Sequence, residues 1–140
     1  MDVVETNQKI NSSKKRVLIG ITGGIAAYKI PLLIRLLIQN NYEVKVIVTE
    51  AAQHFVTIET LSVLSKNIVY KDFFNEKYEW NNHIHLADWA DIMLIAPATA
   101  NTLAKLAYGY CDNLLLATYL SYTKKVIIAP AMDAEMWEHP

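Results

Sequence analysis

The chain has 140 residues, enough for one domain with its own core, and 53% of them are hydrophobic. Thirteen basic and fourteen acidic side chains give a formal net charge of −1. The basic residues are scattered and no apolar run approaches the ~20 residues of a membrane span, which argues against nucleic acid or membranes as partners. Small molecules and further subunits are the expected partners, and the high hydrophobic fraction predicts buried subunit interfaces.

The single cysteine, Cys111, cannot form a disulfide within the chain, which favours a reducing compartment and a cytoplasmic location. Residues 1–14 lack the basic start, apolar middle and small-residue cleavage site of a signal peptide. We therefore expect a disordered N-terminal tail over residues 1–14 and one domain over residues 15–140.

The first part of the domain predicts a βαβ unit. A short β-branched strand over residues 17–21 ends in a glycine turn at residues 22–24, and a helix follows over about residues 25–39. Apolar residues surround almost all of this helix, so one face should meet the sheet and another a partner. Pro31 removes one helical hydrogen bond, which predicts a kink or a later start there. The second strand follows at residues 43–49, with a right-handed crossover.

The remainder of the chain continues to alternate helices and strands. Residues 92–96 form an unbroken apolar run closed by Pro97, which is typical of an interior parallel strand covered on both faces. The other expected elements are helices at residues 50–54, 57–64, 101–108 and 114–122, an edge strand at 68–70, an irregular loop at 71–82 and a last strand at 124–129. This alternation predicts an α/β fold with a doubly wound parallel sheet.

Four strand ends converge on one edge of the predicted sheet, where ligands of open α/β sheets bind. They carry residues 20–24, Thr49, 97–101 and 130–133. The first loop contains neither G-x-G-x-x-G nor G-x-x-x-x-G-K-[ST], so the sequence does not support NAD binding or ATP hydrolysis. A glycine turn before a helix suits a phosphate, although Gly23 and Gly24 are equally explained by turn geometry alone.

Two histidines precede the apolar strand. His83 and His85 would share a face in an extended segment and diverge in a helix. Asp88 and Asp91 complete only a poor set of zinc ligands, so we expect no metal site. A general base is the better functional interpretation, because a small shift brings an imidazole to working pH. The alternative is a pair of surface histidines.

Four ordered motifs carry a family resemblance. Residues 20–29, 83–91, 97–102 and 130–137 resemble, in order and spacing, the flavin-dependent cysteine decarboxylase family, and the resemblance runs from about residue 15 to the end of the chain. It implies a Rossmann-like (flavodoxin-like) flavoprotein that binds FMN. The cofactor-binding residues that it implies are Gly20, Thr22, Gly23, Gly24, Ile25, Ala26, Thr49, Pro97, Ala98, Thr99, Ala100, Asn101 and Thr102.

The resemblance also implies a reaction and an assembly. The implied activity is FMN-dependent decarboxylation of 4′-phosphopantothenoylcysteine to 4′-phosphopantetheine in coenzyme A biosynthesis, with His83 and Asp133 as catalytic residues. Asp133 stands where the family usually has asparagine. A homotrimer or higher assembly with its site at a subunit interface is expected. The resemblance also implies that the domain continues beyond Pro140 with a cysteine-bearing flap. The implied substrate-binding residues are Pro130, Ala131, Met132, Asp133 and Met136.

Other functions of the same fold remain open at this point. A decarboxylase of a peptide's C-terminal cysteine would share the flavin site and differ in the substrate segment. A non-catalytic flavoprotein regulatory subunit would bind partner proteins, and the change to Asp133 keeps it open. A flavin prenyltransferase is disfavoured, because that group lacks the motifs at His83 and at residues 130–137.

Overall fold

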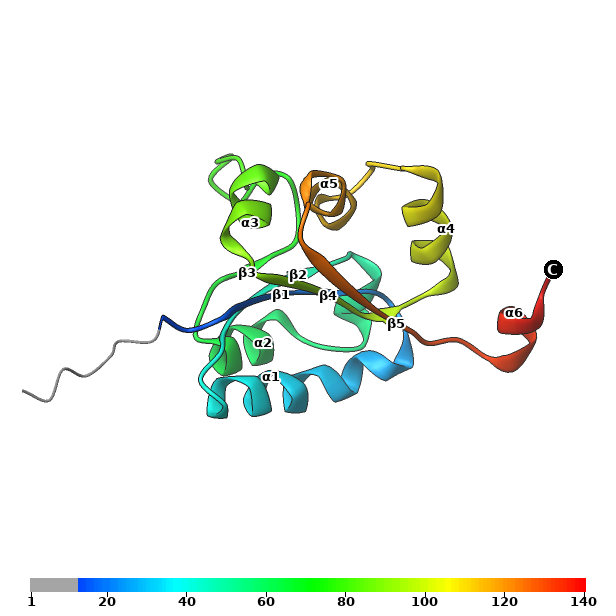
Figure 1. The fold of residues 1–140 in the computed structure, drawn as a ribbon, viewed down its shortest axis with the longest axis horizontal. Helices are drawn as coiled ribbons and strands as arrows, with labels where there is room; N and C mark the ends of the chain where they lie inside the picture. The colour runs from blue at the N-terminus through cyan, green and yellow to red at the C-terminus, as the bar shows by residue number, and fades with distance from the viewer. Residues whose placement is uncertain (1–12) are drawn as a thin grey trace, which may run out of the picture.

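Five parallel strands form a single sheet in the order β3-β2-β1-β4-β5, seen in a computed structural model that describes residues 13–140 (Figure 1). Residues 1–12, most of the predicted tail, lie outside the described residues. The order is that of a Rossmann-like sheet, so the predicted doubly wound α/β fold is confirmed. The strands are β1 (Arg16–Ile21), β2 (Glu43–Val48), β3 (Val69–Tyr70), β4 (Ile92–Ala98) and β5 (Lys125–Pro130).

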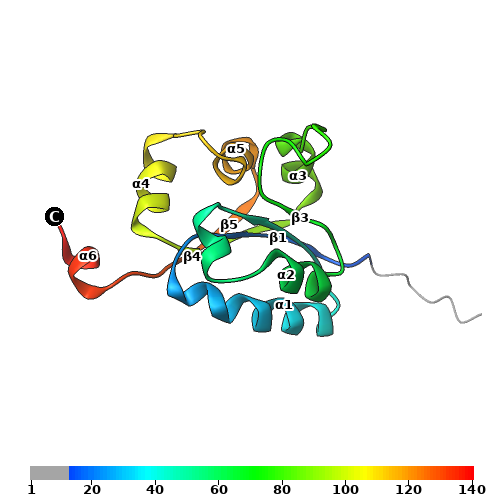
Figure 2. The ribbon, with the colours of Figure 1, turned by 180° about the vertical axis from the view of Figure 1, so that it is seen from behind.

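Helices cover both faces of the sheet, which Figures 1 and 2 show from opposite sides. One face carries α1 and α2, and its core includes Ile19 and Ile34; the other carries α3, α4 and α5, and its core includes Leu18 and Leu115. The helical elements are η1 (Ile25–Lys29), α1 (Ile30–Gln39), η2 (Ala51–His54), α2 (Ile58–Ser65), α3 (His83–Trp89), α4 (Ala100–Tyr108), α5 (Leu114–Ser121) and α6 (Ala134–Glu138). Within residues 13–140, no helix is long and apolar enough to cross a membrane.

The first predicted helix is divided into two. A 3₁₀ helix, η1, occupies its first turn and a half, and α1 begins at Ile30, so the later start predicted from Pro31 is confirmed. Proline is tolerated in this position because the first turn of a helix has unpaired N–H groups in any case. Four large side chains of η1 and α1 lie on the surface in one stripe, here named the α1 stripe: Ile25, Tyr28, Leu32 and Leu36.

Two expectations from the sequence needed correction. Strand β4 continues through Pro97 and Ala98 instead of closing at the proline. Its pairing with β5 shifts register between Ile95 and Ala98, and such an irregularity accommodates a residue that has no N–H group. Residues 71–82, expected to be irregular, contain an antiparallel bridge between Phe74 and Trp80.

Candidate active site

A cavity of about 990 Å³ lies at the carboxyl ends of the parallel strands. Its size is that of a small-molecule site, and the strand ends that the sequence predicted to converge all contribute to it. The lining residues are Thr22, Gly23, Gly24, Ile25, Ala26, Thr49, Glu50, Ala51, His54, Thr99, Ala100, Asn101, Thr102, Lys105, Asp112, Asn113, Ala131, Met132, Asp133 and Met136.

Two residues of the loop after β1 hold the cavity walls together. The Thr22 hydroxyl donates to the carbonyl of Pro97 and accepts from the N–H of Thr99 at 3.1 Å, so it joins this loop to the end of β4. At Gly23, an added Cβ would lie 2.4 Å from the Cβ and 2.9 Å from the carbonyl carbon of Ala51. Gly23 is therefore required by the close approach of two loops. This supports the structural explanation of Gly23 that the sequence left open beside phosphate binding.

Other groups point to a polar ligand. The hydroxyl of Thr49 is buried in the cavity wall and has no hydrogen-bond partner among the described residues. A buried hydroxyl without a partner is costly, so the site suits a ligand that supplies one. Helix α4 directs its N-terminus into the same cavity, with Thr99 as its cap, and a helix N-terminus favours an anion. These features fit a phosphate-bearing mononucleotide.

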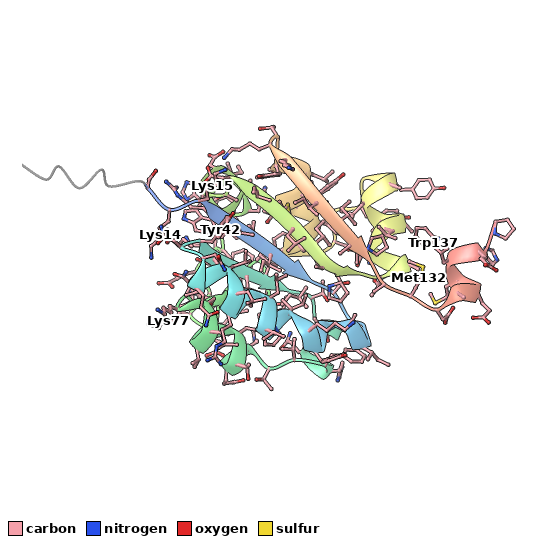
Figure 3. The ribbon with its side chains drawn as sticks, turned by 60° about the horizontal axis from the view of Figure 1, so that its bottom comes forward. Lys14, Lys15, Tyr42, Lys77, Met132 and Trp137 are labelled. Atoms are coloured by element: carbon pink, nitrogen blue, oxygen red, sulfur yellow. The ribbon has the colours of Figure 1, made fainter. Side chains whose placement is uncertain are left out.

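The segment after β5 forms the far wall of the cavity. The Ala131 N–H donates to the Ala98 carbonyl at 3.0 Å, which ties the start of this segment to β4. Asp133 caps α6, and its Oδ1 accepts from the N–H of Met136 at 2.8 Å. Met132 and Trp137 lie on an arm that leaves the sheet at the end opposite Lys14 and Lys15 (Figure 3). One carboxylate oxygen of Asp133 is thus used for structure, and the other remains for a ligand.

Six lining residues were not predicted from the sequence: Glu50, Ala51, His54, Lys105, Asp112 and Asn113. Lys105 on α4 pairs with Asp112 at 2.7 Å. Asn113 caps α5 by accepting from the N–H of Leu116 at 2.8 Å. An asparagine directly before an apolar helix is a typical N-cap, so the sequence indicated that α5 begins after Asn113. Nothing in the sequence indicated that Asn113 would line the cavity.

Four of the predicted cofactor and substrate residues do not line the cavity. Gly20 lies inside β1, where an added Cβ would be 2.3 Å from Cδ1 of Leu115. Pro97, Ala98 and Pro130 lie within β4 and β5. The carbonyl groups of Pro97 and Ala98 accept hydrogen bonds from the Thr22 hydroxyl and the Ala131 N–H, which holds Thr22 and Ala131 in place.

The two predicted catalytic residues are not brought together within one copy of the chain. Asp133 lines the cavity, whereas His83 is the first residue of α3 and does not line it. Figures 1 and 2 both show α3 at the opposite end of the molecule from α6. His83 and His85 lie on a helix, so they diverge, and His85 is exposed. Within one copy, His83 and Asp133 therefore do not line the same cavity.

Two tyrosines outside the cavity have raised pKa values. Burial raises the pKa of Tyr70. Burial also raises the pKa of Tyr122, and the nearby Asp91 carboxylate adds to the increase. A raised pKa keeps a phenol neutral near pH 7, so neither tyrosine is a base there. Within residues 13–140, no three His, Cys, Asp or Glu side chains form a group that could hold a metal ion.

Comparisons with known proteins agree with the geometry. The coenzyme A biosynthesis bifunctional protein CoaBC of Bacillus subtilis (strain 168) is 46% identical over 129 residues, covering 91% of this chain and 32% of that protein. A probable phosphopantothenoylcysteine decarboxylase of Streptococcus mutans serotype c (strain ATCC 700610 / UA159) is 44% identical over 129 residues, covering 90% of this chain and 72% of that protein. The crystal structure of the FMN-dependent cysteine decarboxylase SpaF superposes with a TM-score of 0.83 at 31% identity, covering 91% of this chain and 74% of that one.

The chain spans about a third of the length of the bifunctional relatives that it matches. The model of the family described as Flavoprotein matches residues 5–140. Since this match takes in the glycine turn, the α4 N-terminus and the segment after β5, the chain belongs to the Flavoprotein family.

Proposed function

We propose that the chain binds FMN in the cavity at the strand ends. Support comes from the cavity's unpartnered Thr49 hydroxyl and from the similarity to a protein named as an FMN-dependent cysteine decarboxylase. Gly23, Gly24, Thr49 and residues 99–102 would hold the cofactor. When bound, FMN supplies a two-electron acceptor for the thiol-bearing carbon of the substrate, which makes the loss of its carboxylate easier.

Thr49→Val tests the cofactor assignment, because valine has the shape of threonine without the hydroxyl. We expect FMN to bind about tenfold more weakly, the effect of losing one hydrogen bond from a desolvated site. We expect the cofactor-free variant to unfold at a slightly higher temperature than the cofactor-free parent, since an unpartnered buried hydroxyl is removed. Fluorescence titration and thermal unfolding measure the two effects. Unchanged FMN affinity would contradict the placement of the cofactor at Thr49.

We propose further that the chain decarboxylates 4′-phosphopantothenoylcysteine in coenzyme A biosynthesis. The observation that carries this proposal is the 44% identity, over 90% of the chain, to a probable phosphopantothenoylcysteine decarboxylase, together with a cavity whose far wall is the segment after β5. Asp133 and Met136 would contact the substrate there. His83 would act as the base through Nε2, because its Nδ1 is buried.

The proposed site needs His83 from a second copy of the chain. We propose a homotrimer, or a higher assembly of trimers, in which His83 of one copy reaches the cavity of another. The distance between α3 and α6 within one copy supports a shared site. The α1 stripe supports association, because its four large side chains, each at least 49% exposed, would leave water in an interface.

Parallel assays separate the proposed substrate from its nearest alternative. The purified protein with added FMN is given 4′-phosphopantothenoylcysteine or a short peptide with a C-terminal cysteine, and release of CO₂ is measured. We expect turnover of the first substrate and at least a hundredfold lower kcat/KM for the peptide, about 3 kcal/mol of transition-state discrimination. Preference for the peptide would identify a peptidyl-cysteine decarboxylase. No turnover of either, with FMN bound, would favour a regulatory subunit.

A further inference from the structure

Residues 73–81, named here the 73–81 hairpin, form a closely bonded unit in a stretch whose sequence shows no regular period. The N–H of Asn75 donates to the carbonyl of Glu79 at 2.9 Å, and the N–H of Asn81 donates to the carbonyl of Phe73 at 2.7 Å. The side-chain oxygen of Asn75 accepts from the N–H groups of Lys77 and Glu79, each at 2.9 Å. These bonds fix the two arms and place Trp80 at the end of the returning arm.

The Trp80 ring meets His83, the first residue of α3. The two ring centroids are 5.9 Å apart and the rings are inclined at 68°, an edge-to-face arrangement within the favourable range for aromatic pairs. Trp80 is 52% exposed, so burial of its own surface does not explain why it is held here. The contact joins the hairpin to the proposed base.

The imidazole of His83 lacks the usual means of orientation. A catalytic histidine is normally held by a hydrogen bond from the ring nitrogen that does not react. Here Nδ1 of His83 is buried and has no hydrogen-bond partner among the described residues. Asn82 does not supply one: its side-chain oxygen caps α3 by accepting from the N–H groups of Ile84 and His85, and its amide nitrogen makes no hydrogen bond to the ring. The ring contact with Trp80 is therefore available to fix the imidazole where a hydrogen bond is not.

We propose that Trp80 is a positioning residue that holds the His83 imidazole in its working orientation, with the 73–81 hairpin as its support. The proposal rests on the proposed function for the role of His83 as base. Loss of the aromatic pair leaves the imidazole free to take other rotamers, so the productive fraction falls while substrate binding in the cavity is unchanged. The effect appears in kcat and leaves KM as it was.

Three variants of the FMN-loaded protein test this role. Trp80→Leu should lower kcat about tenfold with KM unchanged, the order expected from one lost aromatic pair. Trp80→Phe keeps an aromatic ring and should retain most of the kcat. Tyr78→Asn is the matched control: it removes an 89% exposed ring from the same hairpin at a residue with φ of 60°, which asparagine tolerates. A Trp80→Leu enzyme with the parent's kcat, or equal losses in Trp80→Phe and Trp80→Leu, would overturn the proposal.

A measurement on His83 itself decides the ring contact without an activity assay. The imidazole carbon-bound proton signals of the four histidines are recorded by NMR, and His83 is assigned by its absence in His83→Asn. We expect Trp80→Leu to move the His83 signal out of the ring-current field of the indole and to leave His54 and His139 unmoved, with no change in Tyr78→Asn. An unmoved His83 signal would overturn the proposal. If the His83 signal moves but the parent protein has no decarboxylase activity, the ring contact is supported and the proposed reaction is contradicted.

Discussion

Replacing His83 with asparagine is expected to abolish decarboxylation while FMN binding and the assembly are kept. The imidazole is the group expected to take up the substrate's proton, and asparagine has no nitrogen that can do so near neutral pH. Loss of a general base costs about 10²–10⁴-fold in kcat. Because His83 does not line the cavity of its own chain, the substitution leaves the cofactor site of that chain intact.

His85→Asn provides the matched control. His85 lies two residues later on the same helix, is exposed, and points away from the direction of His83. We expect its kcat to remain within a factor of about two of the parent's, as for surface substitutions generally. Equal losses in the two variants, or an active His83→Asn enzyme, would show that the base lies elsewhere.

Gly24→Leu is expected to exclude FMN without unfolding the protein. An added Cβ at Gly24 has one neighbour within 4 Å, the Cγ2 of Thr99 at 3.6 Å, which is an ordinary contact, and the backbone φ of −141° suits any residue. The larger leucine side chain would extend into the cavity that Gly24 and Thr99 line. Purified Gly24→Leu should be colourless, and fluorescence titration should detect no saturable FMN binding.

The neighbouring glycine distinguishes a blocked cavity from a damaged fold. Gly23→Ala places a Cβ against the backbone of Ala51, and such overpacking costs about 1–3 kcal/mol of unfolding free energy. We expect it to lower the thermal midpoint of the cofactor-free protein by several degrees, whereas Gly24→Leu leaves the midpoint near that of the parent. A lower thermal midpoint for Gly24→Leu than for Gly23→Ala would contradict the assignment of Gly23 to the loop contact and of Gly24 to the open cavity wall.

Much of the fold could be predicted because the local sequence patterns favour the same helices and strands that the packed fold contains. The apolar run at residues 92–96 marks most of β4 directly, and the glycine turn at residues 22–24 marks the end of β1. Parallel strands then bring their carboxyl ends to one edge whatever the loops contain, which is why the converging strand ends were found. Pro97 was misjudged, because a register shift with β5 is a property of the strand pair and not of one strand.

The candidate site was less accessible to prediction. Thr22 lines the cavity, and its hydroxyl also joins the loop after β1 to the end of β4, a role that the sequence did not predict. Lys105 and Asp112 line the cavity and pair with each other, an arrangement that no local sequence pattern indicates. The 73–81 hairpin depends on the side chain of Asn75, whose polar surroundings resemble those of an ordinary loop.

The most direct test of the account is complementation between two inactive variants. His83→Asn keeps the cavity and lacks the base, whereas Gly24→Leu keeps the base and has a blocked cavity. The two chains are co-expressed with different affinity tags, and mixed assemblies are isolated through both tags and assayed with 4′-phosphopantothenoylcysteine. A site shared between copies predicts that the mixed assemblies release CO₂ although neither variant does so alone. Mixed assemblies that bind FMN and remain inactive would contradict it.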